Sequence, residues 1–191
     1  RKLSTQKAAA GSAPRPDAGR GRAVGVSIDD LLASNLNHKK DVTRSFDLTG
    51  RVTREAGDEG VLFALGTENS GLSVFVQGDR FVVDYNAFDD HTVAESTVPV
   101  PTGPSVLTAR VRTGAARSGR IELLVDGEPA GGVDVPQLLF MFSSVGASIG
   151  YDHGSQVSPM YSGPSPFRGR LERVDVQLVA RPDPADEAAD D

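Results

Sequence analysis

The feature that most limits the fold of this chain is a long run of short, β-prone segments separated by turn residues. From Asp41 to Ala180, valine, threonine and aromatic residues alternate with polar ones. Strands are predicted over residues 42–54, 60–66, 72–77, 80–88, 90–98, 105–113, 120–126 and 167–179. Because the chain has no long helical periodicity and its connections are short, neighbouring strands should be antiparallel. The pattern predicts an all-β fold of two antiparallel sheets, a β-sandwich or jelly roll.

Turn chemistry and side-chain phase agree with this architecture. Asp126-Gly127 is a pair preferred in tight hairpins, where positive φ is required. In the strand over 105–113, the residues Leu107, Ala109 and Val111 share one face, and arginines occupy the other. Since side chains alternate across a strand, the first set should face the core.

The last predicted strand changes its hydrophobic phase once. Its apolar residues occupy odd positions up to Leu171 and even positions from Val174 onward. A single shift of this kind indicates a β-bulge, in which one extra residue re-aims the side chains that follow.

The spacing F-x-G-x-L-x-x-V-x-V-x-L, residues 167–178, resembles the closing strand of concanavalin A-like and laminin G-like sandwiches. In those folds the closing strand returns to the sheet that carries the N-terminal strand. More narrowly, residues 35–178 resemble the C-terminal β-sandwich domain of large bacterial arylsulfatases. That resemblance rests on the order and spacing of residues 60–66, 71–76, 85–88, 124–128, 140–143 and 150–158, with Tyr161.

The resemblance to arylsulfatases does not extend to their catalytic residues. Such enzymes use a formylglycine made from the Cys or Ser of a C/S-x-P-x-R motif, together with a divalent metal. The chain has no cysteine. The nearest serine match begins at Ser162, but Pro166 stands where the arginine should be, and a proline-rich loop is the better interpretation. We therefore expect no enzyme activity from this chain; if it belongs to a longer protein, the resemblance implies an arylsulfatase parent.

Other catalytic schemes find little support. His38, His91 and His153 lie in separate segments, which favours ordinary surface or loop histidines over a zinc site. No G-x-S-x-G motif is present for a serine nucleophile. The carboxylates at positions 84, 122 and 126 do not follow the strand motif of the sandwich glucanases, and polar strand faces account for them.

A binding role is open. Candidate ligand-binding residues are Tyr85, Asn86, Asp152, His153 and Tyr161. Asp152 stands between two glycines, where its carboxylate could hold Ca²⁺ with nearby carbonyls, although capping of the turn is favoured. No other cofactor is expected. A sugar usually stacks on an exposed Trp or Tyr, and the chain has no Trp and only three Tyr residues, which weakens the lectin hypothesis.

Composition divides the chain and limits its partners. Residues 1–23 are predicted to be a basic Ala/Gly/Pro-rich linker or disordered arm, residues 24–180 the β-sandwich domain, and residues 181–191 an acidic disordered tail. Residues 26–34 form a short amphipathic run that suits one or two helical turns or a cover for the sheet edge. A net charge of −6 argues against nucleic acid, and no apolar run approaches the ~20 residues that cross a membrane.

Two functions from different classes follow from these observations. The first is a non-catalytic accessory domain of an arylsulfatase-like sulfuric ester hydrolase, whose partner is the sulfatase catalytic domain, in cis or in trans. The second is an independent, lectin-like glycan-binding module. An assembly role through the two charged tails is a third possibility.

Overall fold

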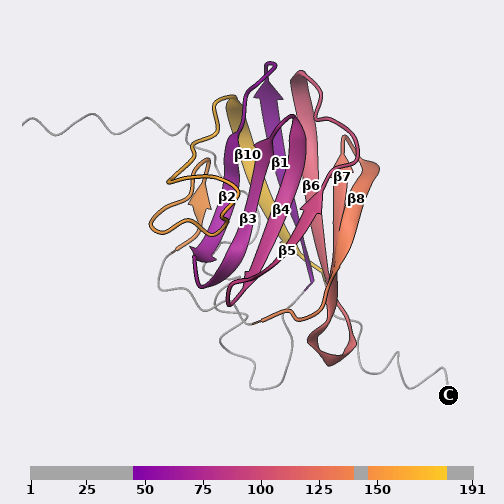
Figure 1. Ribbon diagram of the computed structural model, residues 1–191. Coiled ribbons are helices and arrows are strands. Elements are labelled where there is room, and N and C mark those ends of the chain that lie inside the picture. Colours follow the sequence, from indigo (N-terminus) through magenta and orange to yellow (C-terminus); the bar gives the residue numbers. More distant parts are fainter. Residues whose placement is uncertain (1–44, 140–145, 180–191) are drawn as a thin grey trace, which may run out of the picture.

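The computed structural model describes residues 45–139 and 146–179, and it confirms the two-sheet antiparallel β-sandwich. Each sheet has five strands, in the orders β10-β1-β6-β7-β8 (sheet A) and β5-β4-β3-β2-β9 (sheet B). Figure 1 shows β2 to β5 of sheet B in front of sheet A. The strands are β1 (Phe46–Arg54), β2 (Gly60–Thr67), β3 (Ser70–Gln77), β4 (Arg80–Ala87), β5 (Asp90–Glu95), β6 (Gly103–Thr113), β7 (Gly119–Val125), β8 (Glu128–Val135), β9 (Ser148–Ile149) and β10 (Arg170–Leu178).

Short connections join most consecutive strands as antiparallel hairpins, as their turn residues predict. The closing strand β10 pairs antiparallel with β1, the first described strand, which is the arrangement that the laminin G-like spacing implied. Within the described residues a single turn of 3-10 helix, Ala115–Arg117, interrupts the strands. In that part of the chain no helix is long and apolar enough to cross a lipid bilayer.

The predicted bulge lies in β10. Arg51 of β1 pairs with Arg173, but the next residue, Val52, pairs with Leu171, so Glu172 has no partner of its own across the ladder. The extra residue moves the apolar side chains that follow it onto the core face, where Val174 is 1% exposed. The phase shift read from the sequence is therefore confirmed.

The main core fills the space between the two sheets. Leu107, Ala109 and Val111 of β6 are buried there, as predicted, with Phe81 and Val83 from β4 of the facing sheet. Strands β2, β3 and β4 are buried along almost their whole length, on both faces. Sheet B must therefore be covered on its outer face too, and this second covering shapes the candidate site.

The sequence pattern did not predict strands β8 and β9, and the final strand, β10, begins later than predicted. Strand β8 contains Pro129 and the pair Gly131-Gly132, residues that are depleted in strands and tolerated at a sheet edge, where β8 lies. Strand β9 has only two residues, too few for a periodic signal. Phe167 and Gly169 precede β10 rather than open it. The predicted arm, the amphipathic run over 26–34, His38 and the acidic tail lie outside the described residues.

Candidate functional site

The outer face of sheet B is partly covered by the long loop between β9 and β10, residues 150–169, called here the β9–β10 loop. In Figure 1 this loop appears in orange beside β2. Three neighbouring strands each contribute a buried residue to the covered surface: Val61 of β2, Phe75 of β3 and Val82 of β4, which lie opposite one another across the strand pairs. Val157 and Tyr161 of the loop complete a second small apolar core with them. The Tyr161 ring meets Phe75 edge to face, with ring centroids 5.2 Å apart.

A buried polar network holds the loop on this face. The Tyr161 hydroxyl donates to Oδ2 of Asp152 at 2.5 Å, and the Val157 amide donates to the same oxygen at 2.8 Å. Ser73 of β3 lies 2.8 Å from the Tyr161 hydroxyl oxygen and, since the tyrosine proton goes to Asp152, Ser73 donates to it. Ser73, Asp152 and Tyr161 are 0%, 2% and 8% exposed. Burial, with the bond to the Asp152 carboxylate, raises the pKa of Tyr161 well above its usual 10.

The predicted site residues fall into different places. Asp152 and Tyr161 meet directly, as described above, inside the β9–β10 loop. Asn86 points to the same outer face and reaches the loop through the carbonyl of Val157 at 3.3 Å. Tyr85 lies on the opposite face of β4, in the main core. Burial there raises the Tyr85 pKa, and its hydroxyl meets the backbone of Leu139.

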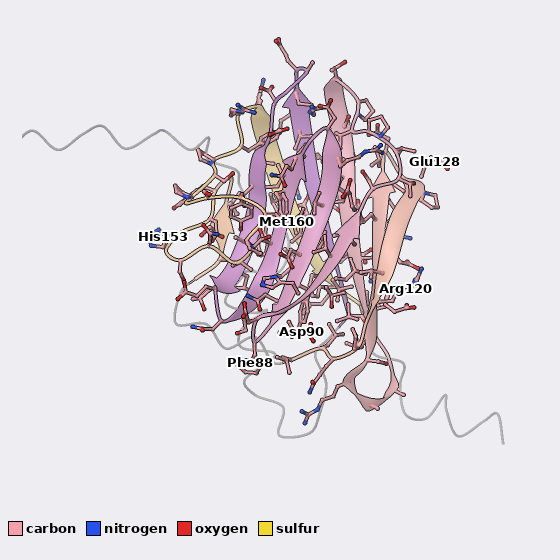
Figure 2. The ribbon with its side chains drawn as sticks, in the orientation of Figure 1. Phe88, Asp90, Arg120, Glu128, His153 and Met160 are labelled. Atoms are coloured by element: carbon pink, nitrogen blue, oxygen red, sulfur yellow. The ribbon has the colours of Figure 1, made fainter. Side chains whose placement is uncertain are left out.

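His153 is the exposed member of the predicted set. It lies on the β9–β10 loop, at the side of the molecule in Figure 2, with its ring edge to face against Tyr151 and the centroids 6.2 Å apart. The structure therefore brings Asn86, Asp152 and Tyr161 together and separates them from Tyr85. Ligand binding by these residues stays a prediction.

Asn86 fastens three connections at one end of sheet B. Its Nδ2 donates to the carbonyl of Glu68 in the β2–β3 turn at 2.7 Å, besides the bond to Val157. Its Oδ1 accepts from the amide of Asp89 in the β4–β5 turn at 2.8 Å. Asn86 is only 1% exposed, so a buried side chain links two turns and the β9–β10 loop by hydrogen bonds. We call this end, formed by the two turns and the adjoining loop, the Asn86 rim.

A carboxylate–imidazole pair beside this rim was not predicted. Asp84 of β4 is fully buried, and Nδ1 of His91 on β5 lies 2.9 Å and 3.0 Å from its two carboxylate oxygens. A carboxylate accepts, so His91 donates from Nδ1 and directs Nε2 away. Asp84 does lie on a polar strand face, as expected, but it is buried there, and His91 is a strand residue paired with it and only 19% exposed rather than a free surface or loop histidine. The pair is diagonal across a hairpin, because Asp84 lies opposite Val93 and Asn86 opposite His91.

The polar side chains of the β9–β10 loop bond to one another and to the backbone. Within residues 45–139 and 146–179, no three His, Asp or Glu side chains are placed to share a metal ion. A Ca²⁺ ion at Asp152 would have to replace the bonds from Tyr161 and Val157. The segment that starts at Ser162 is a loop bonded through its backbone, with the Asp152 amide donating to the Pro164 carbonyl at 2.8 Å. These contacts hold the loop in shape.

Comparison with known proteins gives the fold. No protein-family model matches the sequence, and no curated protein matches it. Among solved structures, the chain is similar to domains LG4-5 of the mouse laminin alpha1 chain, with a TM-score of 0.56 and 12% identity over 75% of this chain and 38% of that one. It is also similar to a protein of Bacteroides ovatus described as a candidate carbohydrate-binding protein, with a TM-score of 0.51 and 20% identity over 76% and 40%.

The chain thus spans about two fifths of the length of these two structures. At such identities the likeness shows the fold alone, which is the β-sandwich fold that the laminin G domains share and that the closing-strand spacing predicted.

Proposed function

We propose that this chain is a non-catalytic glycan-binding module whose ligand site lies at the Asn86 rim. The observation that carries the proposal is the tie that Asn86 makes between the two turns and the β9–β10 loop. Loops held at one end of a rigid sandwich are where such scaffolds place binding residues. The buried Asn86 side chain fixes the geometry of these loops before a ligand binds, so the loops lose little conformational entropy on binding.

Two further points support binding over catalysis. The buried acids are engaged by neighbours: Asp152 accepts from Tyr161 and Val157, and Asp84 accepts from His91. Each carboxylate is thus used to hold a neighbouring group in place. The Bacteroides ovatus protein that shares the fold is described as a candidate carbohydrate-binding protein, which supports sugars as the ligand class.

A glycan microarray probed with the full chain, with Ca²⁺ and then with EDTA, tests the proposal. We expect binding to a restricted group of glycans. Silence across the array under both conditions overturns glycan binding. The same preparation is assayed with p-nitrophenyl sulfate, for which we expect no turnover, and sustained turnover overturns the non-catalytic assignment.

An accessory role beside an arylsulfatase catalytic domain is the second candidate, and the ordered sequence pattern favours it. One part of that pattern, residues 150–158 with Tyr161, lies in the loop that covers sheet B. Size-exclusion chromatography of the chain mixed with an arylsulfatase catalytic domain tests this role. Co-elution supports it, and independent elution at micromolar concentration counts against it.

A further inference from the structure

We propose that Phe88, Asp89 and His91 form a binding site for a neutral pyranose sugar at the β4–β5 turn. The inference rests on the proposed glycan-binding function and assigns its contact residues and ligand class. Phe88 and Asp90 appear at the same end of sheet B in Figure 2.

Phe88 offers a flat apolar surface to solvent. It is 73% exposed, more than any other large hydrophobic residue in the described part of the chain. A ring this exposed buries little surface in folding. It is available to stack against the C–H face of a pyranose, as aromatic rings do in sugar sites.

The backbone at Phe88 is in a conformation that bulky residues avoid. Phe88 and Asp89 have φ values of 57° and 68°, so both central residues of this two-residue turn are left-handed. The β3–β4 and β7–β8 turns, Gly78-Asp79 and Asp126-Gly127, share positive φ at both positions, and each contains a glycine. A phenylalanine in place of glycine or asparagine favours a role for the side chain itself, since strained positions concentrate at functional sites.

Asn86 holds the strained turn in place. Its side-chain oxygen accepts from the Asp89 amide, and its nitrogen is anchored to the neighbouring turn and to the β9–β10 loop. The backbone of the turn that carries Phe88 is therefore held by buried contacts. Asn86, predicted from the sequence as a ligand residue, becomes a positioning residue for this site.

Polar groups for sugar hydroxyls lie in the same turn and on the strand that follows it. His91 Nδ1 is occupied by Asp84, which leaves Nε2 for a ligand, and the His91 side chain is 19% exposed. Nε2 lies 3.9 Å from Oδ1 of Asp89, whose side chain is 97% exposed. At this separation neither atom bonds the other, and both can meet neighbouring hydroxyl groups of one sugar ring.

The charge of the site selects neutral sugars. Glu68 in the β2–β3 turn, Asp89 and Asp90 are all exposed at the Asn86 rim. Carboxylates at this density repel the sulfate, sialate or uronate groups of anionic glycans. The exposed ring favours a sugar at the end of a glycan chain or on an accessible face of it.

The experiment uses the full chain in EDTA with cello-, malto-, manno-, xylo- and galactotetraose, and with heparin and sialyllactose as anionic probes. Affinity for the tightest tetraose is then measured by titration calorimetry for Phe88→Asn and Asp89→Asn. Asparagine tolerates left-handed φ, so neither variant should unfold the turn. Val98→Asn is the matched control, because Val98 is 43% exposed and lies beyond the other end of β5.

We expect Phe88→Asn to weaken binding about tenfold or more, Asp89→Asn several-fold, and Val98→Asn to have no effect, in line with the loss of one stacking contact. Unchanged affinity in both turn variants overturns the location and leaves glycan binding standing. Binding of the anionic probes alone overturns the neutral class, and a requirement for Ca²⁺ overturns direct contact. Silence with every probe here and on the microarray removes the proposed function as well.

Discussion

The guanidinium of Arg54, the last residue of β1, is buried against the carboxylate of Asp79 in the β3–β4 turn. The arginine side chain is 1% exposed and the aspartate side chain 52%. Arg54 also donates from Nη1 to the Val100 carbonyl at 2.6 Å and from Nε to the Asp58 carbonyl at 3.3 Å. One buried cation thus joins the two sheets at the end of β4 opposite Phe88.

Replacing Arg54 should destabilise the sandwich strongly. Arg54→Met keeps most of the side-chain volume but leaves the buried Val100 carbonyl without its donor. We expect a loss of about 2–4 kcal/mol in the free energy of unfolding, measured in urea. Asp79→Asn is the control, and it should cost clearly less than Arg54→Met, because the carboxylate is half exposed to water and asparagine keeps an acceptor oxygen for Arg54. Equal effects in the two variants would show that the backbone bonds of Arg54 contribute little.

The same pair predicts an acid-sensitive contribution to stability. The hydrogen bond and the positive charge of Arg54 hold the Asp79 pKa below its ordinary 3.8. A lowered pKa in the folded state means that the contribution is complete above about pH 4 and is lost as the pH falls through the lowered pKa. The difference in unfolding free energy between wild type and Asp79→Asn should therefore shrink below pH 4. A difference that stays constant from pH 7 to pH 2 contradicts this assignment.

Local sequence pattern was sufficient for most of the fold. Alternation placed β6 and its core face, and the phase shift between Leu171 and Val174 located the bulge opposite β1. The pattern failed for β8, because Pro129 and two glycines are residues that disfavour a strand. They are tolerated there because β8 lies at the edge of sheet A. Pairing with β7 forms that strand, and short-range propensity does not report such pairing.

The β9–β10 loop should depend on the Tyr161 hydroxyl. Tyr161→Phe removes the donor to Asp152 and leaves that buried carboxylate with the Val157 amide. We expect a loss of about 1–3 kcal/mol in unfolding free energy. Ser73→Ala, which removes the weaker partner of the hydroxyl, should cost less. A neutral result for Tyr161→Phe would show that the hydroxyl bond adds nothing to stability.

The Tyr161 hydroxyl also predicts how stability changes at alkaline pH. Its pKa is raised above the usual 10 in the folded state, so the contribution is complete below pH 10 and is lost as the pH rises beyond it. Wild type should lose stability above pH 10 more steeply than Tyr161→Phe, as followed by circular dichroism. Parallel profiles for the two proteins contradict a protected phenol.

The candidate site was harder to predict than the fold because its contacts join distant parts of the chain. Asp152 and Tyr161 were singled out from one local stretch, yet Ser73, the second partner of the Tyr161 hydroxyl, comes from β3. Asp84 and His91 needed the hairpin register, which places them diagonally on one face. The turn at Phe88-Asp89 lacks the glycine or asparagine typical of such turns, so its positive φ left no trace in the sequence.

Strain at Phe88 predicts that the protein becomes more stable when the ring is removed. Phe88→Asn exchanges a bulky residue at φ 57° for one that tolerates this region, and little buried surface is lost because Phe88 is 73% exposed. We expect a gain of about 1 kcal/mol in unfolding free energy. Gly127→Ala is the reverse control: its φ is 87° and an added Cβ meets nothing within 4 Å, so only backbone strain is introduced. It should cost about 1 kcal/mol. A loss of stability in Phe88→Asn would mean that the ring is held by packing, and its availability to a sugar would then need another explanation.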